Sequence, residues 1–355
     1  MPHNSNQSTL KKLLGAIDAG DFKYESKEKE PINWTAYDQA QINEINDMLE
    51  YIRDVVDRAV RELHIRERYA KDREKPGQPA IFPGDLAKSI LMQQYFQASN
   101  RVTQGIVNLF HEKMGISSSF SYKSIERAYD NKYVQEILKK IFEITQEPVA
   151  EKERSFSTDG TGFPTSIKYN YEQEKHGKKG DERNLDMFEQ AILTVGSTFQ
   201  IIADFIITDN PHANESPYLK QAVNSVSETY QNIDLWTADA AFTSRENTST
   251  IGSVGATPRI YPKVTDTFQA KGSPEWKEMH YDFVAKTQEW LRDYHKRSIS
   301  ETVNSTYLRM YPKPLGRRIR LRRLNEASTR VCGYNIKRLV YLKYLKGIEI
   351  RHNIT

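Results

Sequence analysis

The chain has 355 residues, of which 38% are hydrophobic, and its formal net charge is +4. This composition is typical of a soluble globular protein with room for two domains. The single cysteine, Cys332, excludes a disulfide framework and any cysteine-rich zinc site. The N-terminus is polar and no apolar stretch approaches about 18 residues, so we expect neither a signal peptide nor a membrane span. The expected location is cytoplasmic.

The small net charge conceals a polarised chain. Residues 310–355 contain 12 Lys and Arg against two acids, a net charge of +10, which leaves −6 for residues 1–309. The basic segment includes an arginine cluster of five residues, which are Arg317, Arg318, Arg320, Arg322 and Arg323. Arginines this close, without acids between them, repel one another when no anion is bound. The cluster therefore favours a polyanionic partner such as nucleic acid.

Residues 1–30 are polar and short of aliphatic side chains, which predicts a flexible arm. Thr35-Ala36-Tyr37-Asp38 has the spacing of a capping box, and apolar residues recur every three or four positions from Ile42 to Leu63. The pattern predicts a helix of roughly 30 residues, long enough to act as a packing or dimerisation arm. Lys75-Pro76-Gly77 should stop it.

Two more helices are expected, one after Pro83-Gly84 with Asp85 as a possible cap, and one from about Arg101 to Gly115. A short turn then leads to a helix over residues 121–129. This layout is typical of a helix-turn-helix whose second helix presents Tyr122, Lys123, Ser124 and Arg127 outward. The alternative is an ordinary helical hairpin with a solvated polar face. Residues 31–150 are therefore expected to form a helical DNA-binding or dimerisation domain.

Beyond Pro148 the pattern changes to strands. Ser155 to Asp159 predicts a first strand, and two β-rich runs around Gly196 predict a hairpin. A charged segment lies between these elements, at residues 168–186. Later elements are a helix over 217–230, a strand over 233–238, a short strand at 259–261, and a helix from Phe283 through Glu301. The order predicts an α/β fold with a mixed sheet flanked by helices.

Motifs for nucleotide phosphates, dinucleotides, zinc proteases and α/β-hydrolases are absent from the sequence. What remains are acids at informative positions. Asp159 and Asp239 end predicted strands, where open α/β sheets place their ligand crevice. Glu301 shares a helical face with Tyr294 and Arg297. Three converging carboxylates are the ligands that two Mg²⁺ or Mn²⁺ ions need for phosphodiester chemistry.

Three strings around these acids carry a family resemblance. They are Asp159-Gly160-Thr161-Gly162-Phe163, Ala238-Asp239-Ala240-Ala241-Phe242-Thr243-Ser244, and Tyr294-x2-Arg297-x3-Glu301. Together they resemble the catalytic blocks of DDE transposases encoded by prokaryotic insertion sequences. The resemblance spans about Tyr37 to the C-terminus, because residues 120–129 look like the N-terminal region of archaeal members.

The resemblance implies a ribonuclease H-like catalytic domain over residues 151–312, in which Asp159, Asp239 and Glu301 bind two Mg²⁺ (or Mn²⁺) ions. It implies cleavage at element ends, strand transfer into target DNA, and a homodimer on double-stranded DNA that carries the terminal inverted repeats. The basic C-terminal helical segment, residues 313–355, is expected to pack on the catalytic domain. The expected DNA contacts are Tyr122, Lys123, Arg127, Tyr294, Arg297, Arg309 and the arginine cluster.

Two residues depart from the family pattern. A lysine of that pattern falls at Leu308, with Arg309 next to it, and Glu215 stands where relatives often have Asp. These departures leave open a catalytically inactive, transposase-derived DNA-binding protein. A ribonuclease H-like nuclease without strand transfer is a further alternative.

Overall fold

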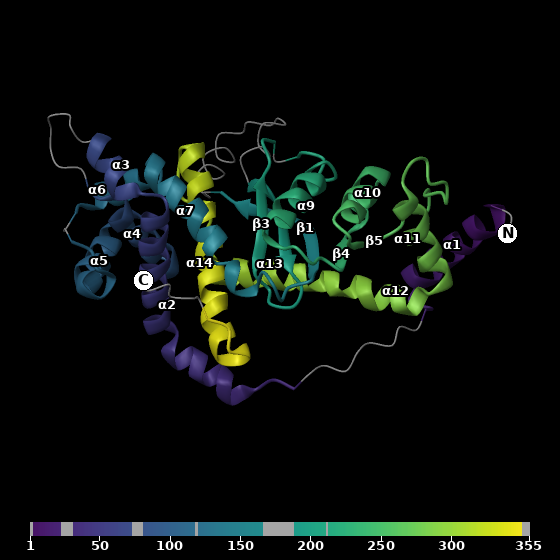
Figure 1. The fold of residues 1–355 in the computed structure, drawn as a ribbon, viewed down its shortest axis with the longest axis horizontal. Coiled ribbons are helices and arrows are strands. Elements are labelled where there is room, and N and C mark those ends of the chain that lie inside the picture. The colour runs from purple at the N-terminus through teal and green to yellow at the C-terminus, as the bar shows by residue number, and fades with distance from the viewer. Residues whose placement is uncertain are drawn as a thin grey trace, which may run out of the picture. The chain divides into compact units, whose positions relative to one another are not determined.

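The computed structural model describes residues 3–22, 31–72, 81–117, 120–165, 188–210 and 212–349. The chain divides into two compact units (Figure 1). The sheet unit comprises Met1–Ile32, Ala150–Gly162 and Gln190–Thr306. The helical unit comprises Asn33–Val149, Phe163–Glu189 and Tyr307–Thr355. Each unit is thus assembled from separate stretches of chain, whereas the sequence had predicted consecutive domains.

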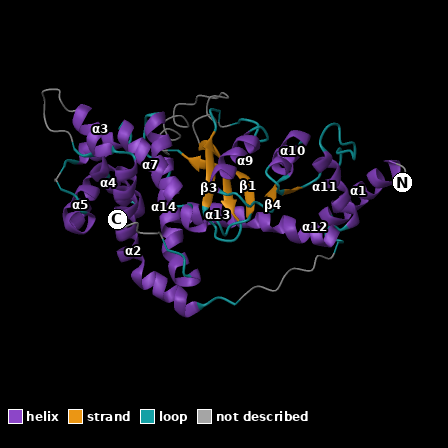
Figure 2. Cartoon of the chain, viewed as in Figure 1, coloured by secondary structure: helices purple, strands orange, loops and turns teal. Residues whose placement is uncertain are grey.

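The described strands form one five-stranded sheet, drawn as orange arrows in Figure 2. Its members are β1 (Ser155–Pro164), β2 (Phe188–Gly196), β3 (Ile202–Ile207), β4 (Leu235–Ala238) and β5 (Thr257–Ile260). The strand order is β3-β2-β1-β4-β5. β2 and β3 are antiparallel, whereas β4 is parallel to both β1 and β5. The expected mixed sheet in an α/β fold is therefore confirmed.

The β2–β3 hairpin turns at Gly196, as the sequence predicted. The carboxylate of Glu153 lies inside the turn, where it accepts hydrogen bonds from the backbone N–H groups of Thr198 and Phe199, each at 2.9 Å. A β-carbon on Gly196 would lie 2.5 Å from Oε2 of Glu153. Glycine is required here because the carboxylate occupies the space of a side chain.

The first strand differs from the prediction. β1 does not end at Asp159 but continues to Pro164. Phe156, Ser157 and Thr158 are buried, and the strand becomes half-exposed from Asp159 to Gly162. Asp159 therefore lies within the strand, at the residue where the side chains change from buried to half-exposed.

Four helices pack on the sheet or beside it. They are α9 (Tyr218–Thr229) against β3, α10 (Arg245–Ser253) and α11 (Pro274–Ala285) against β5, and α12 (Thr287–Tyr294) against β4 and β5. The core of this unit includes Phe156 and Trp236, whose rings lie 5.6 Å apart and are fully buried. The indole N–H of Trp236 donates to the hydroxyl of Thr158 at 3.0 Å.

The single helix predicted from Phe283 through Glu301 is wrong. α11 ends at Ala285, and α12 is followed by one turn of 3₁₀-helix, η4 (His295–Arg297), before α13 (Ser298–Met310) begins. Tyr294, Arg297 and Glu301 therefore lie on three successive elements. The spacing of the apolar residues does not reveal the breaks between α11, α12, η4 and α13, because buried and half-buried residues recur at helical spacing through all of these elements.

The flexible arm predicted for residues 1–30 is also wrong over most of its length. Residues His3–Asp18 form helix α1, which packs on α11. Leu10 and Leu14, one turn apart, are both buried. This pair is a short apolar stripe that an otherwise polar composition conceals. Residues 23–30 lie outside the described residues.

The helical unit contains seven described α-helices and one short 3₁₀-helix. They are α2 (Trp34–Glu62), α3 (Ile65–Asp72), α4 (Pro83–Tyr95), α5 (Asn100–Met114), α6 (Tyr122–Ala128), α7 (Lys132–Ile144), η1 (Glu147–Val149) and α14 (Arg320–Lys346). α2 has the predicted length, but its N-terminal cap is Asn33, whose side chain accepts from the N–H of Ala36 at 3.1 Å. The predicted capping box at Thr35 is thus wrong by two residues. The predicted stop at residues 75–77 lies outside the described residues.

α14 packs on α2, α4 and α7. Its buried face includes Val331, Leu339 and Val340. The expectation that residues 313–355 pack on a catalytic domain stays a prediction, and α14 is a helix of the helical unit. Its length and buried face exceed those of a surface tail.

Candidate active site

Asp159 is the centre of the candidate site in the sheet unit. Its side chain is only 15% exposed, and burial raises the pKa of its carboxyl to about 6. Arg297 opposes the rise, whereas the charges of Asp239, Glu301 and Glu215 add to it. Four carboxylates therefore share one electrostatic field, as expected for a group of acids whose mutual repulsion is incompletely neutralised.

The sheet places Asp239 beside Asp159. Thr158 and Ala238 are partners in the parallel register of β1 and β4, and the two aspartates are the next residues along their chains. Asp239 also caps a turn of 3₁₀-helix, because its Oδ1 accepts from the N–H of Ala241 at 2.7 Å. The sequence predicted this neighbourhood from the ends of two strands.

Arg297 connects two of the predicted acids. Its Nη1 lies 3.7 Å from Oδ1 of Asp159, and its Nη2 forms an ion pair with Oε1 of Glu301. Glu301 lies in the first turn of α13, with a side chain that is 55% exposed. The guanidinium supplies positive charge between two carboxylates that would otherwise repel each other.

Tyr294 forms the aromatic side of the site. Its ring packs on Trp290 and Tyr261, with centroids 5.2 and 5.3 Å away, and the guanidinium carbon of Arg297 lies 5.8 Å from its centre. Burial raises the pKa of the Tyr294 hydroxyl to about 12, and Arg297 opposes the rise. Tyr294 therefore stays protonated and is available as a hydrogen-bond donor.

Two residues in this site were not predicted as part of it. Glu215 lies just before α9 and its carboxylate sits against Gly160, while Nε2 of Gln190 donates to its Oε1 at 3.1 Å. Asn304 on α13 places its Nδ2 3.5 Å from Oδ2 of Asp159. The sequence offered one signal for the first, since Glu215 had been noted as a departure from a family pattern.

The carboxylates around Asp159 are the kind of oxygen ligand that a hard divalent cation binds. Carboxylate oxygens are the ligands that Mg²⁺ and Mn²⁺ prefer, and the repulsion around Asp159 would be relieved by a cation. Within the described ranges, no group of three or more His, Cys, Asp or Glu side chains is arranged to hold a metal ion. The charge between Asp159 and Glu301 is supplied by Arg297.

The arginine cluster of residues 317–323 has protein partners. Arg317 pairs with Glu126, Arg322 with Asp130 at 2.6 Å, and Arg323 with Glu189 at 2.8 Å. Arg320 lies 3.5 Å from Glu189, and Arg318 is exposed. The absence of nearby acids in the sequence had suggested a bound anion, but acids distant in the sequence neutralise four of these arginines.

The predicted recognition helix, α6, is present and short. Lys123 and Arg127 are exposed on it, Ser124 and Tyr122 are half-buried, and the guanidinium carbon of Arg101 lies 5.0 Å from the Tyr122 ring centre. Gly115 ends α5 in the left-handed conformation, with φ of 60°, as the sequence predicted. Arg309, at the end of α13, is also exposed.

Comparisons with known proteins leave this site unassigned. Neither the search against protein-family models nor the search of curated proteins finds a match to the chain. None of the described helices combines the length and apolarity that a membrane crossing requires.

Proposed function

We propose that this protein is a metal-dependent DNA transposase whose sheet unit is a ribonuclease H-like catalytic domain. The observation that carries the proposal is that Arg297 lies between Asp159 and Glu301, with Asp239 next to Asp159 in the register of the sheet. The first acid lies on the first strand, the second follows the fourth strand and the third lies on a late helix. The strand order β3-β2-β1-β4-β5, with an antiparallel hairpin at one edge, supports the same fold.

Asp159, Asp239 and Glu301 would hold two Mg²⁺ or Mn²⁺ ions. Such ions activate an attacking oxygen and stabilise the leaving oxygen of a phosphodiester. Within the protein, Arg297 holds the carboxylates of Asp159 and Glu301 in place through its two ion pairs. A cation bound there would reduce the repulsion among the acids and would favour the ionised carboxylate of Asp159.

The DNA partner is proposed from the exposed cations. Lys123 and Arg127 on α6 project into solvent, as do Arg309 and Arg318. Lys and Arg side chains of this kind contact phosphates and give salt-dependent affinity. Because four members of the arginine cluster are paired with acids, their contribution to DNA binding requires exchange of a carboxylate for a phosphate. Their share of the binding energy should therefore be smaller than that of Lys123 and Arg127.

The test is a cleavage and strand-transfer assay on DNA that carries the terminal inverted repeats of the element. We expect Mg²⁺-dependent products from the natural protein and a loss of at least 100-fold in Asp159→Asn. Asp234→Asn is the matched control, because Asp234 precedes β4, is exposed and pairs with Arg154 on the surface. Normal strand transfer by Asp159→Asn would overturn the assignment.

A second function is favoured by Leu308. This residue takes the place of a lysine in the family pattern, and its side chain is 40% exposed near the end of α13. A protein that lacks this cation is proposed to bind the repeats without cleaving them. Repeat binding with no nicking in Mg²⁺ or Mn²⁺, and activity gained in Leu308→Lys, would support this function. Cleavage without joined products would instead indicate a nuclease.

A further inference from the structure

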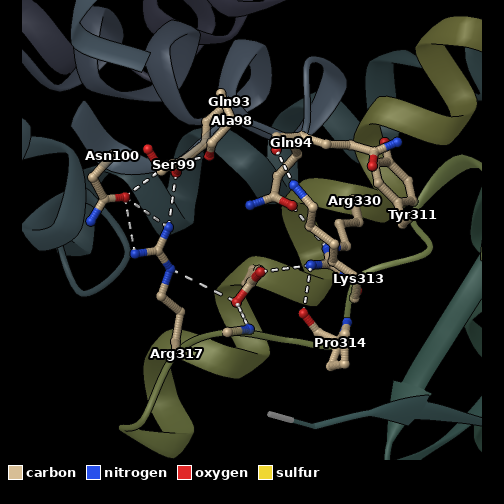
Figure 3. A pocket seen from close by; sticks show the side chains of 13 residues that line it. Gln93, Gln94, Ala98, Ser99, Asn100, Tyr311, Lys313, Pro314, Arg317 and Arg330 are labelled. Carbon is tan, nitrogen blue, oxygen red and sulfur yellow. Dashed lines mark hydrogen bonds and ion pairs between the residues drawn. The ribbon is translucent and has the colours of Figure 1, made fainter. Parts of the chain in front are cut away.

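The helical unit contains a cavity of about 290 Å³ that is separate from the candidate active site (Figure 3). Three segments form its walls: the end of α4 with the loop into α5, residues 311–317, and the first half of α14. All of these belong to the helical unit. The volume is near the lower end of the range for small-molecule sites, about 300–1,000 Å³.

The charged side chains that line this cavity are mostly cationic. Lys313, Arg317 and Arg330 contribute three positive charges, and Glu326 is the one acid among the described lining residues, so the lining has a net charge of +2. Glu126, which pairs with Arg317 from outside the lining, reduces the local charge to +1. Four of the other nine lining residues carry carboxamides, namely Gln93, Gln94, Gln97 and Asn100. A ligand that left these charged groups and carboxamides without polar partners would bury them at a cost.

Arg330 is a fixed part of the wall. Its Nε donates to Oε1 of Gln94 at 2.8 Å, and its Nη1 donates to the carbonyl of Lys313 at 2.7 Å. Its Nη2 donates to the carbonyl of Pro314 at 3.1 Å and to Oε1 of Glu326 at 2.8 Å. The charge of Glu326 is therefore largely neutralised by Arg330.

Arg317, on the opposite side of the cavity, has a buried N–H donor that makes no hydrogen bond. Its Nη groups donate to Gln93, Asn100 and Glu126. Its Nε is completely buried and makes no hydrogen bond. Oε2 of Glu326 forms an ion pair with this Nε at 3.8 Å, too far for a hydrogen bond, and accepts instead from the N–H of Gly316 at 2.9 Å. A buried donor of this kind is a position for an acceptor atom of a ligand.

Lys313 adds a second source of donors. Its ammonium makes one hydrogen bond, to the carbonyl of Gln97 at 2.8 Å, out of the three that a lysine can donate. We propose that the cavity binds a small oxyanion, such as inorganic phosphate or the phosphate group of a nucleotide, whose oxygens accept from Arg317 Nε and Lys313 Nζ. This inference does not depend on the proposed catalysis, because none of its residues belongs to the sheet unit.

The experiment is titration calorimetry of the full chain with potassium phosphate, at an ionic strength held constant with potassium chloride. We expect saturable binding of one phosphate per chain. Lys313→Gln should raise the Kd at least tenfold, and Arg317→Lys should abolish binding, because lysine keeps the charge but lacks a donor at the Nε position. Arg318→Gln is the matched control, since Arg318 is an exposed cation of the same segment, and its Kd should stay within twofold.

Two further arms distinguish the source of the phosphate. A nucleoside monophosphate should compete with inorganic phosphate, whereas a short DNA duplex should not displace it. Displacement by the duplex alone would assign the cavity to a DNA contact and overturn the proposal. Absence of saturable binding, or an equal loss in Arg318→Gln, would overturn it as well. Lys313→Gln removes only the charge of an exposed side chain, so this variant should fold. It still tests the proposal if Arg317→Lys does not fold.

Discussion

The carboxylate of Glu215 occupies the space that a β-carbon of Gly160 would fill, one residue along the strand from Asp159. The carboxyl carbon of Glu215 lies 2.5 Å from that position. A glycine in the middle of β1 therefore has a steric reason that the sequence alone did not provide. It allows a fourth acid to approach the strand that carries the first predicted catalytic residue.

Gly160→Ala should displace Glu215 from this position. Because the added methyl group overlaps the carboxylate, we expect a loss of about 1–3 kcal/mol in the free energy of unfolding, measured in urea. In a Glu215→Ala background the loss should fall by at least half, since the overlapping group is gone. Gly105→Ala, at an exposed helical position where no atom lies within 4 Å, should instead be neutral or stabilising. Equal losses in both backgrounds would contradict the steric explanation.

Asp204 should make the stability of the protein fall with pH. Burial raises the pKa of this carboxyl to about 7, against the hydrogen bond from Ser225. Because the ordinary pKa of the carboxyl is 3.8, the folded state holds an extra proton between about pH 4 and pH 7, so stability falls as the pH rises through this range and is constant above it.

Asp204→Asn removes this titration. The stability of the variant relative to the natural protein should rise by about 2–3 kcal/mol from pH 5 to pH 8, as measured by urea unfolding at each pH. A difference that is constant over this range would show that the carboxyl is already ionised in the folded state.

Arg330→Gln should be strongly destabilising. The side chains of Arg330 and Glu326 are only 7% and 5% exposed, so loss of the guanidinium leaves a buried carboxylate without its partner. We expect a cost of about 3–5 kcal/mol. Arg318→Gln, at an exposed position, should change the stability by less than about 0.5 kcal/mol. Guanidinium chloride unfolding compares the two, and similar small values would mean that solvent reaches the Arg330 pair.

Leu14→Ala tests whether the N-terminal residues are a folded helix. Leu14 is 1% exposed where α1 packs on α11, so its truncation should cost about 2–4 kcal/mol in the unfolding of the sheet unit. Lys11→Ala, on the exposed side of the same helix, should have little effect. If both substitutions were silent in thermal and urea unfolding, residues 3–18 would be a flexible arm after all.

Local features were largely predictable from the sequence. The hairpin at Gly196, the end of α5 at Gly115 and the neighbourhood of Asp159 and Asp239 all follow from signals within a few residues. The breaks between α11, α12 and α13 were not predictable, because each helix continues the apolar periodicity of the one before it. The cap at Asn33 was missed because Thr35 offered an equally good pattern two residues later.

Long-range pairing was the part that the sequence could not supply. Arg317, Arg322 and Arg323 have no acid nearby in the chain before Glu326, yet their partners Glu126, Asp130 and Glu189 lie more than 130 positions away. The same holds for Glu215 and Gly160, which are brought together only by the sheet. Charge counted along the chain therefore overestimated the positive charge that these arginines leave unneutralised.

The packing of α14 on α2 constrains how the protein is made. The two helices lie near opposite ends of the chain, and the sheet unit occupies most of the chain between them. During synthesis, residues 34–62 leave the ribosome long before residues 320–346. Until α14 has been made, the apolar side chains of α2 lack one of the helices that bury them. A nascent chain that stops before α14 thus leaves α2 exposed to chaperones and proteases, and only complete translation yields a stable helical unit.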